Sequence, residues 1–345
     1  MANVIDVHIH FGAPGKNGAV DNGCYWSPKF EQTAAYWAFR LITGTMCKKI
    51  DFDLAKSTMF KVVEGSTKVD KFVFLALDQV YNKQGDSDTA NWTNLYVQNS
   101  AIVGLAEENT HILIGASVHP YRLDWEDELD YCLEKGAALC KWLPSAQGID
   151  FDEQLCVPFY RKLADNHLPL LCHVGPELSI PAYDESFTEF NNPKYLRRAL
   201  DEGVPVIFAH CSLPFEPASL GDDAVFQEFL KIMKEAHDNG SWKAYADISA
   251  LCLLRSSYVP ILLGLDYIEP KQFILGSDYP IPMIDFSYKK VPSVWDWVKH
   301  FWETLTAKNA LDKNLLLLED MGFTADSFTA ANDLFSQNVN RPLNL

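Results

Sequence analysis

The sequence predicts an α/β protein folded as a single (β/α)8 TIM barrel, and three observations support this fold class. Eight short apolar runs, most ending in polar residues, lie at residues 4–10, 72–78, 112–119, 138–143, 168–174, 204–211, 244–249 and 273–278. Most of these runs are continuously apolar, which is typical of parallel strands covered on both faces. Helical patterns lie between them, so the chain repeats the strand and helix of a βαβ unit.

Amphipathic helical patterns are clearest at residues 125–135, 158–166 and 224–237. Glycines such as Gly136, Gly203 and Gly240 suit the left-handed residue that ends many helices. The competing architecture is a doubly wound open sheet. It is disfavoured because no predicted strand is followed by the glycine-rich turn G-x-G-x-x-G of such sheets.

Two regions interrupt the alternation of strands and helices. Residues 11–70 are rich in glycine near their start and then in aromatic residues, so we expect a loop and helices that cover the barrel mouth. Trp26 and Trp37 in this insertion are candidates for a pocket wall. Residues 291–345 are expected to form a C-terminal helical tail packed on the barrel. Because no repeat, low-complexity tract or linker is found, we expect residues 1–345 to form one domain.

Composition restricts the classes of partner. The net charge of −17 opposes binding to nucleic acid, because there is no basic surface to neutralise phosphates. No apolar run approaches the length of about eighteen residues that suggests a membrane helix. The expected partner is therefore a small-molecule substrate, with a homo-oligomer left open.

The N-terminus and the cysteines indicate the compartment. The first residues lack the basic segment of a signal peptide. The eight cysteines form no C-x-x-C pair, and several lie in or beside apolar runs, which is typical of reduced core thiols. We therefore expect a cytoplasmic protein without disulfides.

Histidines gather at the ends of the predicted strands, where barrel enzymes place their reactive groups. Of nine histidines, five stand at such ends: His8, His10, His119, His173 and His210. His8 and His10 are two residues apart on one strand, so their side chains point to the same face. Asp278 ends the last strand in the same way.

Four histidines (His8, His10, His173 and His210) and one carboxylate at one barrel mouth favour a divalent transition metal, most simply zinc, with one or two ions. Each residue alone has a structural alternative, since a single strand-end histidine is often hydrogen-bonded in the core and His119 can simply cap its strand. Their joint placement with Asp278 is what indicates a metal site.

Lys141 ends the fourth predicted strand, where it shares a face with Leu143. An ammonium group beside a metal would be repelled, and burial would lower its pKa. Two functional alternatives remain open: carbon dioxide adds to the neutral amine to give a bridging carbamate, or the ammonium pairs with a carboxylate or a substrate anion. A purely structural salt bridge is the third possibility.

The sequence resembles the amidohydrolase superfamily at IDVHIH (residues 5–10), at Lys141, at the strand-end histidines 173 and 210, and at GSDYP (residues 276–280). The closing QNVNRPLNL (residues 337–345) is similar to the ending of the amidohydrolase-related, or type 2, subgroup. The resemblance implies that His8 and His10 bind a first metal, Lys141 bridges as a carboxylated lysine, His173 and His210 bind a second metal, and Asp278 ligates the first metal and shuttles a proton. Single-metal members imply an alternative in which His8, His10, His173 and Asp278 hold one ion and His210 acts on substrate or water.

The resemblance also implies a metal-dependent hydrolase that cleaves an amide, lactone or ester bond of a small molecule. Residues expected to contact the substrate are His119, Tyr121, Arg122, Glu177 and Trp26, which lie past strand ends or in the insertion. One alternative is a non-oxidative decarboxylase or hydratase of an aromatic or unsaturated acid on the same scaffold. Another is a non-catalytic small-molecule binder.

Overall fold

A computed structural model describes residues 2–214, 223–252, 255–281 and 307–336. At its centre, eight parallel strands follow one another in chain order around a single sheet. They are β1 (Ile5–His10), β3 (Lys71–Leu75), β5 (Ile112–Ala116), β6 (Ala137–Trp142), β7 (Leu170–Cys172), β8 (Val206–Phe208), β9 (Ala244–Asp247) and β10 (Phe273–Ile274). All eight fall within or beside the predicted apolar runs.

The first and last strands close the sheet into a barrel. The backbone nitrogen of Val7 donates to the carbonyl of Leu275 at 2.9 Å, and that of His10 donates to the carbonyl of Tyr279 at 2.8 Å. The predicted (β/α)8 barrel is therefore confirmed, and the open sheet is excluded.

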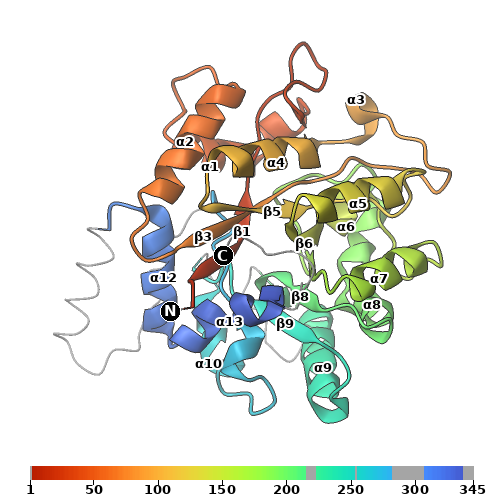
Figure 1. Ribbon diagram of the computed structural model, residues 1–345, viewed down its shortest axis with the longest axis vertical. Coiled ribbons are helices and arrows are strands. Elements are labelled where there is room, and N and C mark those ends of the chain that lie inside the picture. The colour runs from red at the N-terminus through yellow and green to blue at the C-terminus, as the bar shows by residue number, and fades with distance from the viewer. Residues whose placement is uncertain (1, 215–222, 253–254, 282–306, 337–345) are drawn as a thin grey trace.

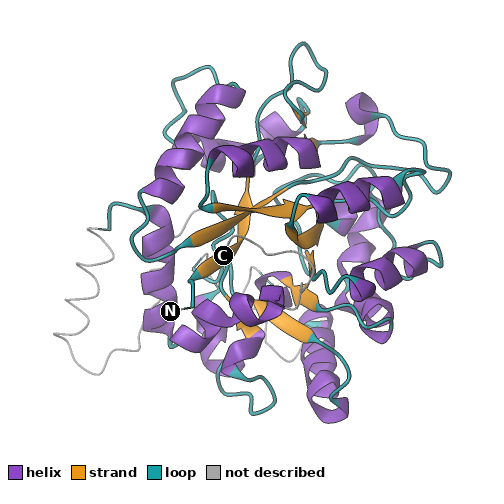
Figure 2. Cartoon of the chain, viewed as in Figure 1, coloured by secondary structure: helices purple, strands orange, loops and turns teal. Residues whose placement is uncertain are grey.

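Helices surround the strands (Figure 1, Figure 2). The α-helices described are α1 (Ala34–Ile42), α2 (Phe52–Glu64), α3 (Thr89–Trp92), α4 (Asn99–Glu108), α5 (Trp125–Glu134), α6 (Pro144–Gln147), α7 (Cys156–Asp165), α8 (Arg197–Asp201), α9 (Ala224–Asn239), α10 (Val259–Leu262), α12 (Ala310–Met321) and α13 (Ala325–Ser336). The 3-10 helices are η1 (Phe30–Gln32), η2 (Glu185–Asn191), η3 (Pro193–Leu196), η4 (Ala209–Ser212), η5 (Ser256–Tyr258) and η6 (Pro270–Gln272). The three helices predicted most clearly correspond to α5, α7 and α9. Gly240 ends α9 with a φ of 65°, as its position predicted.

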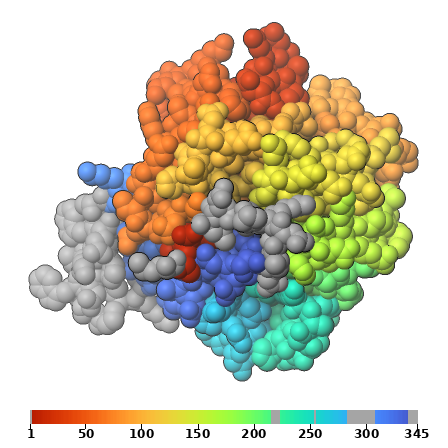
Figure 3. Space-filling view, in the orientation of Figure 1, coloured from red at the N-terminus to blue at the C-terminus, as the bar shows by residue number. Residues whose placement is uncertain are grey.

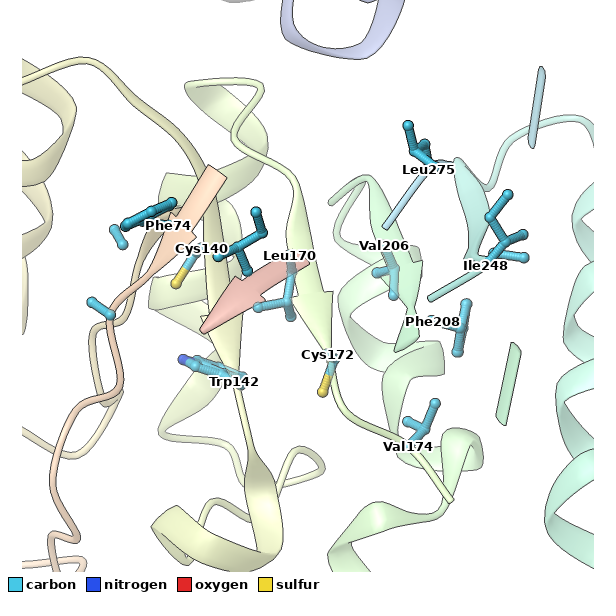
Figure 4. Packing of buried hydrophobic residues seen from close by; sticks show 14 of the residues in the cluster. Phe74, Cys140, Trp142, Leu170, Cys172, Val174, Val206, Phe208, Ile248 and Leu275 are labelled. Carbon is cyan, nitrogen blue, oxygen red and sulfur yellow. The ribbon is translucent and has the colours of Figure 1, made fainter. Parts of the chain in front are cut away.

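The strands carry two apolar layers. Outward side chains such as Trp142, Leu170 and Phe208 pack under the helices (Figure 4). Inward side chains such as Leu171 and Ile207 fill the barrel. This alternation positions the site. Along each strand, the inward-facing residue that follows the apolar filling stands at the open end of the barrel.

Helix α13 covers the end of the barrel at which the strands begin. Its Leu334 and Phe335 belong to the inner apolar cluster. The side chain of Asn332 donates to the carbonyl of Asn3 at 2.6 Å, so the helix lies against the chain just before β1. The N-terminal segment and α13 are accordingly side by side in Figure 3. The end at which the strands finish is therefore the one left open to hold a site.

A small antiparallel ribbon lies outside the barrel sheet. It pairs β2 (Cys24–Trp26) with β4 (Leu95–Val97). The sequence did not predict it, since strands of three residues carry too little pattern to be recognised. Helix α2, also within residues 11–70, instead packs beside the barrel near α12.

Three further expectations concern the cysteines, membrane-spanning helices and the C-terminal tail. All eight cysteines are free. No helix among the described residues is long and apolar enough to cross a membrane. Of the predicted tail, α12 and α13 are described, whereas residues 291–306 and the closing motif at 337–345 lie outside the described residues.

Candidate metal centre and substrate cavity

A bulge in β1 brings both of its histidines to the inner face. Between Asp6 and Ile9, β1 contains more residues than the stretch of β3 that pairs with it. The pairing register therefore shifts between these two residues. Val7 belongs to the inner apolar cluster, whereas Ile9 belongs to the outer one. Two consecutive residues, Val7 and His8, therefore face inward, and His10 follows His8 on the same face.

His8, His10 and Asp278 bring three ligand atoms together. The two histidine Nε2 atoms are 3.1 Å apart. Oδ1 of Asp278 lies 3.4 Å from Nε2 of His8 and 3.1 Å from Nε2 of His10. Around a tetrahedral zinc ion with bonds of about 2.1 Å, neighbouring ligand atoms would be about 3.4 Å apart. The spacing and the donor types therefore fit one divalent transition metal.

Asp247 and Ser249 orient the His8 ring from behind. Nδ1 of His8 lies 2.7 Å from Oδ2 of Asp247, and the hydroxyl of Ser249 donates to the same oxygen. With the Nδ1 proton held by Asp247, the Nε2 lone pair faces the other ligand atoms. Asp247 was missed by the sequence analysis, although it lies in the seventh predicted strand, close to its end.

Glycine at position 276 allows the last strand to approach the site. A Cβ atom at Gly276 would lie 2.9 Å from the Cβ atoms of both His8 and Ser249, closer than real side chains pack. The next residue, Ser277, donates its backbone N–H to Oδ1 of Asp6 at 3.0 Å. The glycine and these contacts place Asp278 beside the histidines.

Left-handed backbone conformations recur at the strand ends. The φ angles are 60° at Asp278, 54° at His210 and 53° at Ala250. Such angles are costly for residues other than glycine, and they persist where the surrounding structure enforces them, often at functional sites. Two of these three residues are predicted site residues.

The pKa values of the ionisable groups at the site are shifted by burial and by neighbouring charges. Burial would raise the pKa of Asp278, but His8, His10 and Lys141 lower it to about 2. Burial lowers the pKa of His8 well below its usual value, and Lys141 lowers it further. Asp278 is therefore an ionised carboxylate and His8 a neutral imidazole, the protonation states that a metal requires.

Lys141 reaches the same cluster. Its side chain is fully buried, and Nζ lies 3.1 Å from Nε2 of His8. Burial lowers the pKa of its amine. Leu143, on the same face of the strand, lines the cavity at the barrel mouth, as the alternation predicted.

His210 and His173 stand beside the cluster in different orientations. The His210 ring stacks on His8, and its Nε2 is 3.9 Å from Oδ2 of Asp278. Nε2 of His173 instead faces its own loop, 3.3 Å from the carbonyl of Pro176 and 3.4 Å from Oε2 of Glu177. The structure therefore brings His173 near the metal centre without grouping its ligand atom with the other three.

A cavity that is open to solvent on one side lies over the cluster. His10, His173, His210 and Asp278 form part of its floor. Its remaining lining is mostly apolar: Phe11, Gly12, Trp26, Phe30, Ala35, Phe39, Leu95, Leu143, Pro176, Leu178, Ile180, Ala250, Pro280 and Ile281, with the polar Glu177, Ser179 and Arg255. The apolar lining with a few polar side chains is that of a small-molecule site.

The predicted substrate contacts divide into two groups. Trp26 and Glu177 line the cavity, but His119, Tyr121 and Arg122 do not. His119 is buried with its Nε2 3.0 Å from the carbonyl of Gln147.

Arg122 pairs with Asp78 at 3.2 Å, away from the cavity. Trp37 is 50% exposed and does not line the cavity, so the prediction that Trp37 forms part of the pocket wall was wrong. It follows the buried Tyr36 on α1, and half of its surface is exposed to solvent. Arg255 was missed, although a cation directly after an apolar run past the seventh strand is a recognisable signal.

Comparison with known proteins gives a family and a fold. The sequence model of the amidohydrolase family matches residues 5–309. An uncharacterised TIM-barrel protein from Bordetella bronchiseptica shares 12% identity over 99% of this chain and 98% of that chain, with a TM-score of 0.55. An amidohydrolase from Burkholderia multivorans with bound HEPES shares 13% identity over 97% of this chain and 99% of that chain, also with a TM-score of 0.55. No curated protein matches the sequence. At these identities the two structures support the fold alone.

Proposed function

Because the chain belongs to the amidohydrolase family and is a metal-dependent hydrolase, we propose that it uses the cluster of His8, His10 and Asp278 to hydrolyse an amide, lactone or ester bond of a small molecule. The observation that carries this proposal is the mutual approach of the three ligand atoms, at 3.1 to 3.4 Å, beneath the cavity.

The donor set suits a single divalent ion held by His8, His10 and Asp278. When bound, such an ion supplies Lewis acidity and lowers the pKa of water at the site. Zinc is the ion that we propose, since two imidazoles and one carboxylate with an open position are typical of catalytic zinc. The second ion that the sequence suggested would need His173 to turn its Nε2 away from Glu177.

Asp278 is the proposed proton carrier. Its pKa of about 2 keeps the carboxylate ionised at neutral pH, ready to accept a proton from the attacking water. Its Oδ2 faces Nε2 of His210 at 3.9 Å, across the floor of the cavity. His210 holds its Nδ1 against Ser249, 2.9 Å from Oγ, so its Nε2 remains directed at this space. We propose that His210 binds the carbonyl oxygen or the leaving group of the substrate.

Lys141 is proposed to act directly at this centre. A fully buried amine 3.1 Å from a metal-ligating nitrogen is either a carbamate ligand or a cation that stabilises developing negative charge. Both alternatives require Nζ of Lys141 to lie beside Nε2 of His8, as it does in this structure.

The experiment compares the protein loaded with zinc with the same protein stripped by a chelator. Aryl and alkyl lactones, amides and esters are offered in water enriched in ¹⁸O. The proposal expects metal-dependent release of an acid that carries one ¹⁸O atom. Release of carbon dioxide from an aromatic acid, without ¹⁸O in the organic product, would instead indicate the decarboxylase. Turnover at an equal rate without metal would contradict the proposal.

A further inference from the structure

Ser249 lies where two histidine rings of the site meet. Its side chain is fully buried, just after the end of β9. Its Oγ is 3.1 Å from Nδ1 of His8 and 2.9 Å from Nδ1 of His210. The same hydroxyl donates its proton to Oδ2 of Asp247. One hydroxyl group therefore contacts the metal-ligating His8, the cavity-lining His210 and the carboxylate behind them.

The carboxylate of Asp247 fixes the direction of the Ser249 hydroxyl. Oδ1 of Asp247 accepts the backbone N–H of Ser249 at 2.9 Å. Oδ2 lies 2.7 Å from Nδ1 of His8 and also accepts the backbone N–H of His210 at 3.4 Å. Both oxygens are thus surrounded by donors and act as acceptors. Because Ser249 has a single hydroxyl proton and gives it to Asp247, its Oγ can only accept from other neighbours.

These contacts define the tautomer of His210. Nδ1 of His210 faces Oγ of Ser249 at 2.9 Å and the carbonyl oxygen of the same residue at 3.3 Å. A carbonyl oxygen can only accept, and Oγ has already donated its proton, so Nδ1 of His210 carries a hydrogen. Nε2 of His210 then carries a lone pair, and this nitrogen is the one that lies 3.9 Å from Oδ2 of Asp278.

Two left-handed turns flank the contact between Ser249 and His210. The φ angle is 54° at His210 and 53° at Ala250, the residue after Ser249. Such angles are unfavourable for residues that carry a side chain, and they persist where the surrounding structure imposes them. Backbone strain on both sides of one hydrogen bond suggests that its geometry matters for function.

We propose that Ser249 is a positioning residue that extends the action of Asp247 from His8 to His210. The chain of hydrogen bonds runs from Nδ1 of His210 to Oγ of Ser249 and on to Oδ2 of Asp247, which also accepts from His8. One carboxylate therefore sets the tautomers of both rings. A ring N–H that donates toward a carboxylate makes the opposite nitrogen of the same ring a better acceptor.

The proposal gives His210 a defined part at the cavity. Its Nε2 offers a lone pair, which suits the N–H or O–H of a leaving group rather than a carbonyl oxygen. This inference rests on the proposed function, because it takes His210 to face the substrate.

The test locates the proton on the ring of His210. Ring ¹⁵N NMR spectra are recorded on the full-length, zinc-loaded protein labelled with ¹⁵N-histidine, and the signals of His210 are assigned by their loss in His210→Asn. The wild type is expected to carry the proton on Nδ1. Ser249→Ala leaves only the carbonyl at 3.3 Å as an acceptor, so the ratio of the two tautomers should shift about fivefold toward Nε2–H.

Asp247→Asn tests the chain itself, because Asp247 reaches the ring of His210 through Ser249. The amide oxygen should keep the place of Oδ1, which accepts the backbone N–H of Ser249, so the NH2 group takes the place of Oδ2. Ser249 would then accept from the amide and donate to Nδ1 of His210. The predominant tautomer of His210 should therefore reverse, a change that a merely structural serine would not transmit.

The matched control is Ser212→Ala. Ser212 is also fully buried, two residues after His210, and its hydroxyl has no hydrogen-bond partner among the described residues. Its removal should leave the tautomer of His210 unchanged. An unchanged tautomer in Ser249→Ala or in Asp247→Asn would overturn the inference, as would a proton on Nε2 in the wild type.

If either variant does not fold, neutron diffraction from crystals of the wild-type protein decides. Deuterium on Nδ1 of His210, together with a Ser249 hydroxyl directed at Asp247, supports the inference. Deuterium on Nε2 of His210 and none on Nδ1, or a Ser249 hydroxyl directed at His210, overturns it.

The two proposals can fail separately. The expected tautomers in a protein that hydrolyses nothing would leave the inference about Ser249 standing and remove the proposed function. Zinc-dependent hydrolysis by a protein whose His210 holds its proton on Nε2 would do the reverse.

Discussion

Nδ1 of His8 lies 2.7 Å from Oδ2 of Asp247, and both side chains are fully buried. This contact fixes the tautomer of His8, because the proton on Nδ1 leaves Nε2 free to bind a metal. Burial raises the pKa of Asp247 to about 6, so the carboxylate is ionised at neutral pH and accepts that proton.

Asp247→Asn is therefore expected to weaken metal binding. The amide can present its NH2 group to Nδ1, which favours the wrong tautomer, and we expect a loss of about 10- to 100-fold in metal affinity. Competition with a fluorescent zinc chelator measures this. Asp238→Asn, at an exposed position on α9, is the control. An unchanged affinity in Asp247→Asn would show that this carboxylate does not orient His8.

Lys141→Ala is expected to lower turnover by at least about tenfold while leaving the fold intact, because it removes the buried amine beside His8. If the lysine carries a carbamate, acetate or propionate should restore part of the activity by replacing the lost carboxylate. Steady-state rates with and without these acids are the measurement. Wild-type activity in Lys141→Ala would refute both the carbamate and the cation at this position.

Trp26 and Trp37 form a natural pair for testing the cavity wall. Trp26 is buried and lines the cavity, whereas Trp37 is 50% exposed and does not. The change in tryptophan fluorescence on binding an aromatic ligand should shrink in Trp26→Phe and persist in Trp37→Phe. The opposite pattern would show that α1 presents its other side to the ligand.

Asp312 anchors α12 to the loop after α2, and its contribution to the free energy of unfolding should depend on pH. Burial raises the pKa of Asp312, but hydrogen bonds from Ser66, Thr67 and Lys68 outweigh burial and lower the pKa below its usual value of 3.8. A lowered pKa in the folded state stabilises the protein above pH 3.8, and this stability is lost as pH falls through the folded value.

Asp312→Asn should therefore lower the free energy of unfolding by about 1 to 2 kcal/mol at pH 7. The difference from wild type should shrink below about pH 4. Urea unfolding at several pH values checks this, with Ser66→Ala as the control that removes one hydroxyl donor (2.6 Å) and keeps the charge. A difference that is the same at pH 7 and pH 3 would exclude the carboxylate charge as its cause.

The barrel was predictable because each of its strands is buried on both faces and so leaves a local apolar signal. The ribbon of β2 and β4 was not, because its two short strands come from distant loops and pair only through the tertiary fold. The bulge in β1 also left no local signal. His8 and His10 share a face with or without it, but it decides that this face is the inner one.

The residues of the candidate site could be predicted only as far as the ends of the strands could be located in the sequence. His8 and His119 have a similar local signature, a histidine near or at the end of a predicted apolar run. Only the three-dimensional structure separates them, since His119 turns to the carbonyl of Gln147 while His8 meets His10 and Asp278. Arg255 lies in an irregular loop, whose path depends on contacts that no periodic pattern encodes.

The central claim is that His8, His10 and Asp278 hold a metal on which hydrolysis depends. Anomalous diffraction from crystals of the zinc-loaded protein, collected on both sides of the zinc edge, tests it most directly. The account predicts a peak about 2.1 Å from Nε2 of His8, Nε2 of His10 and a carboxylate oxygen of Asp278. The peak should vanish in His8→Ala and persist in the matched strand-end variant His119→Ala. A fully active protein with no peak at this cluster, or with a peak that survives His8→Ala unchanged, would contradict the account.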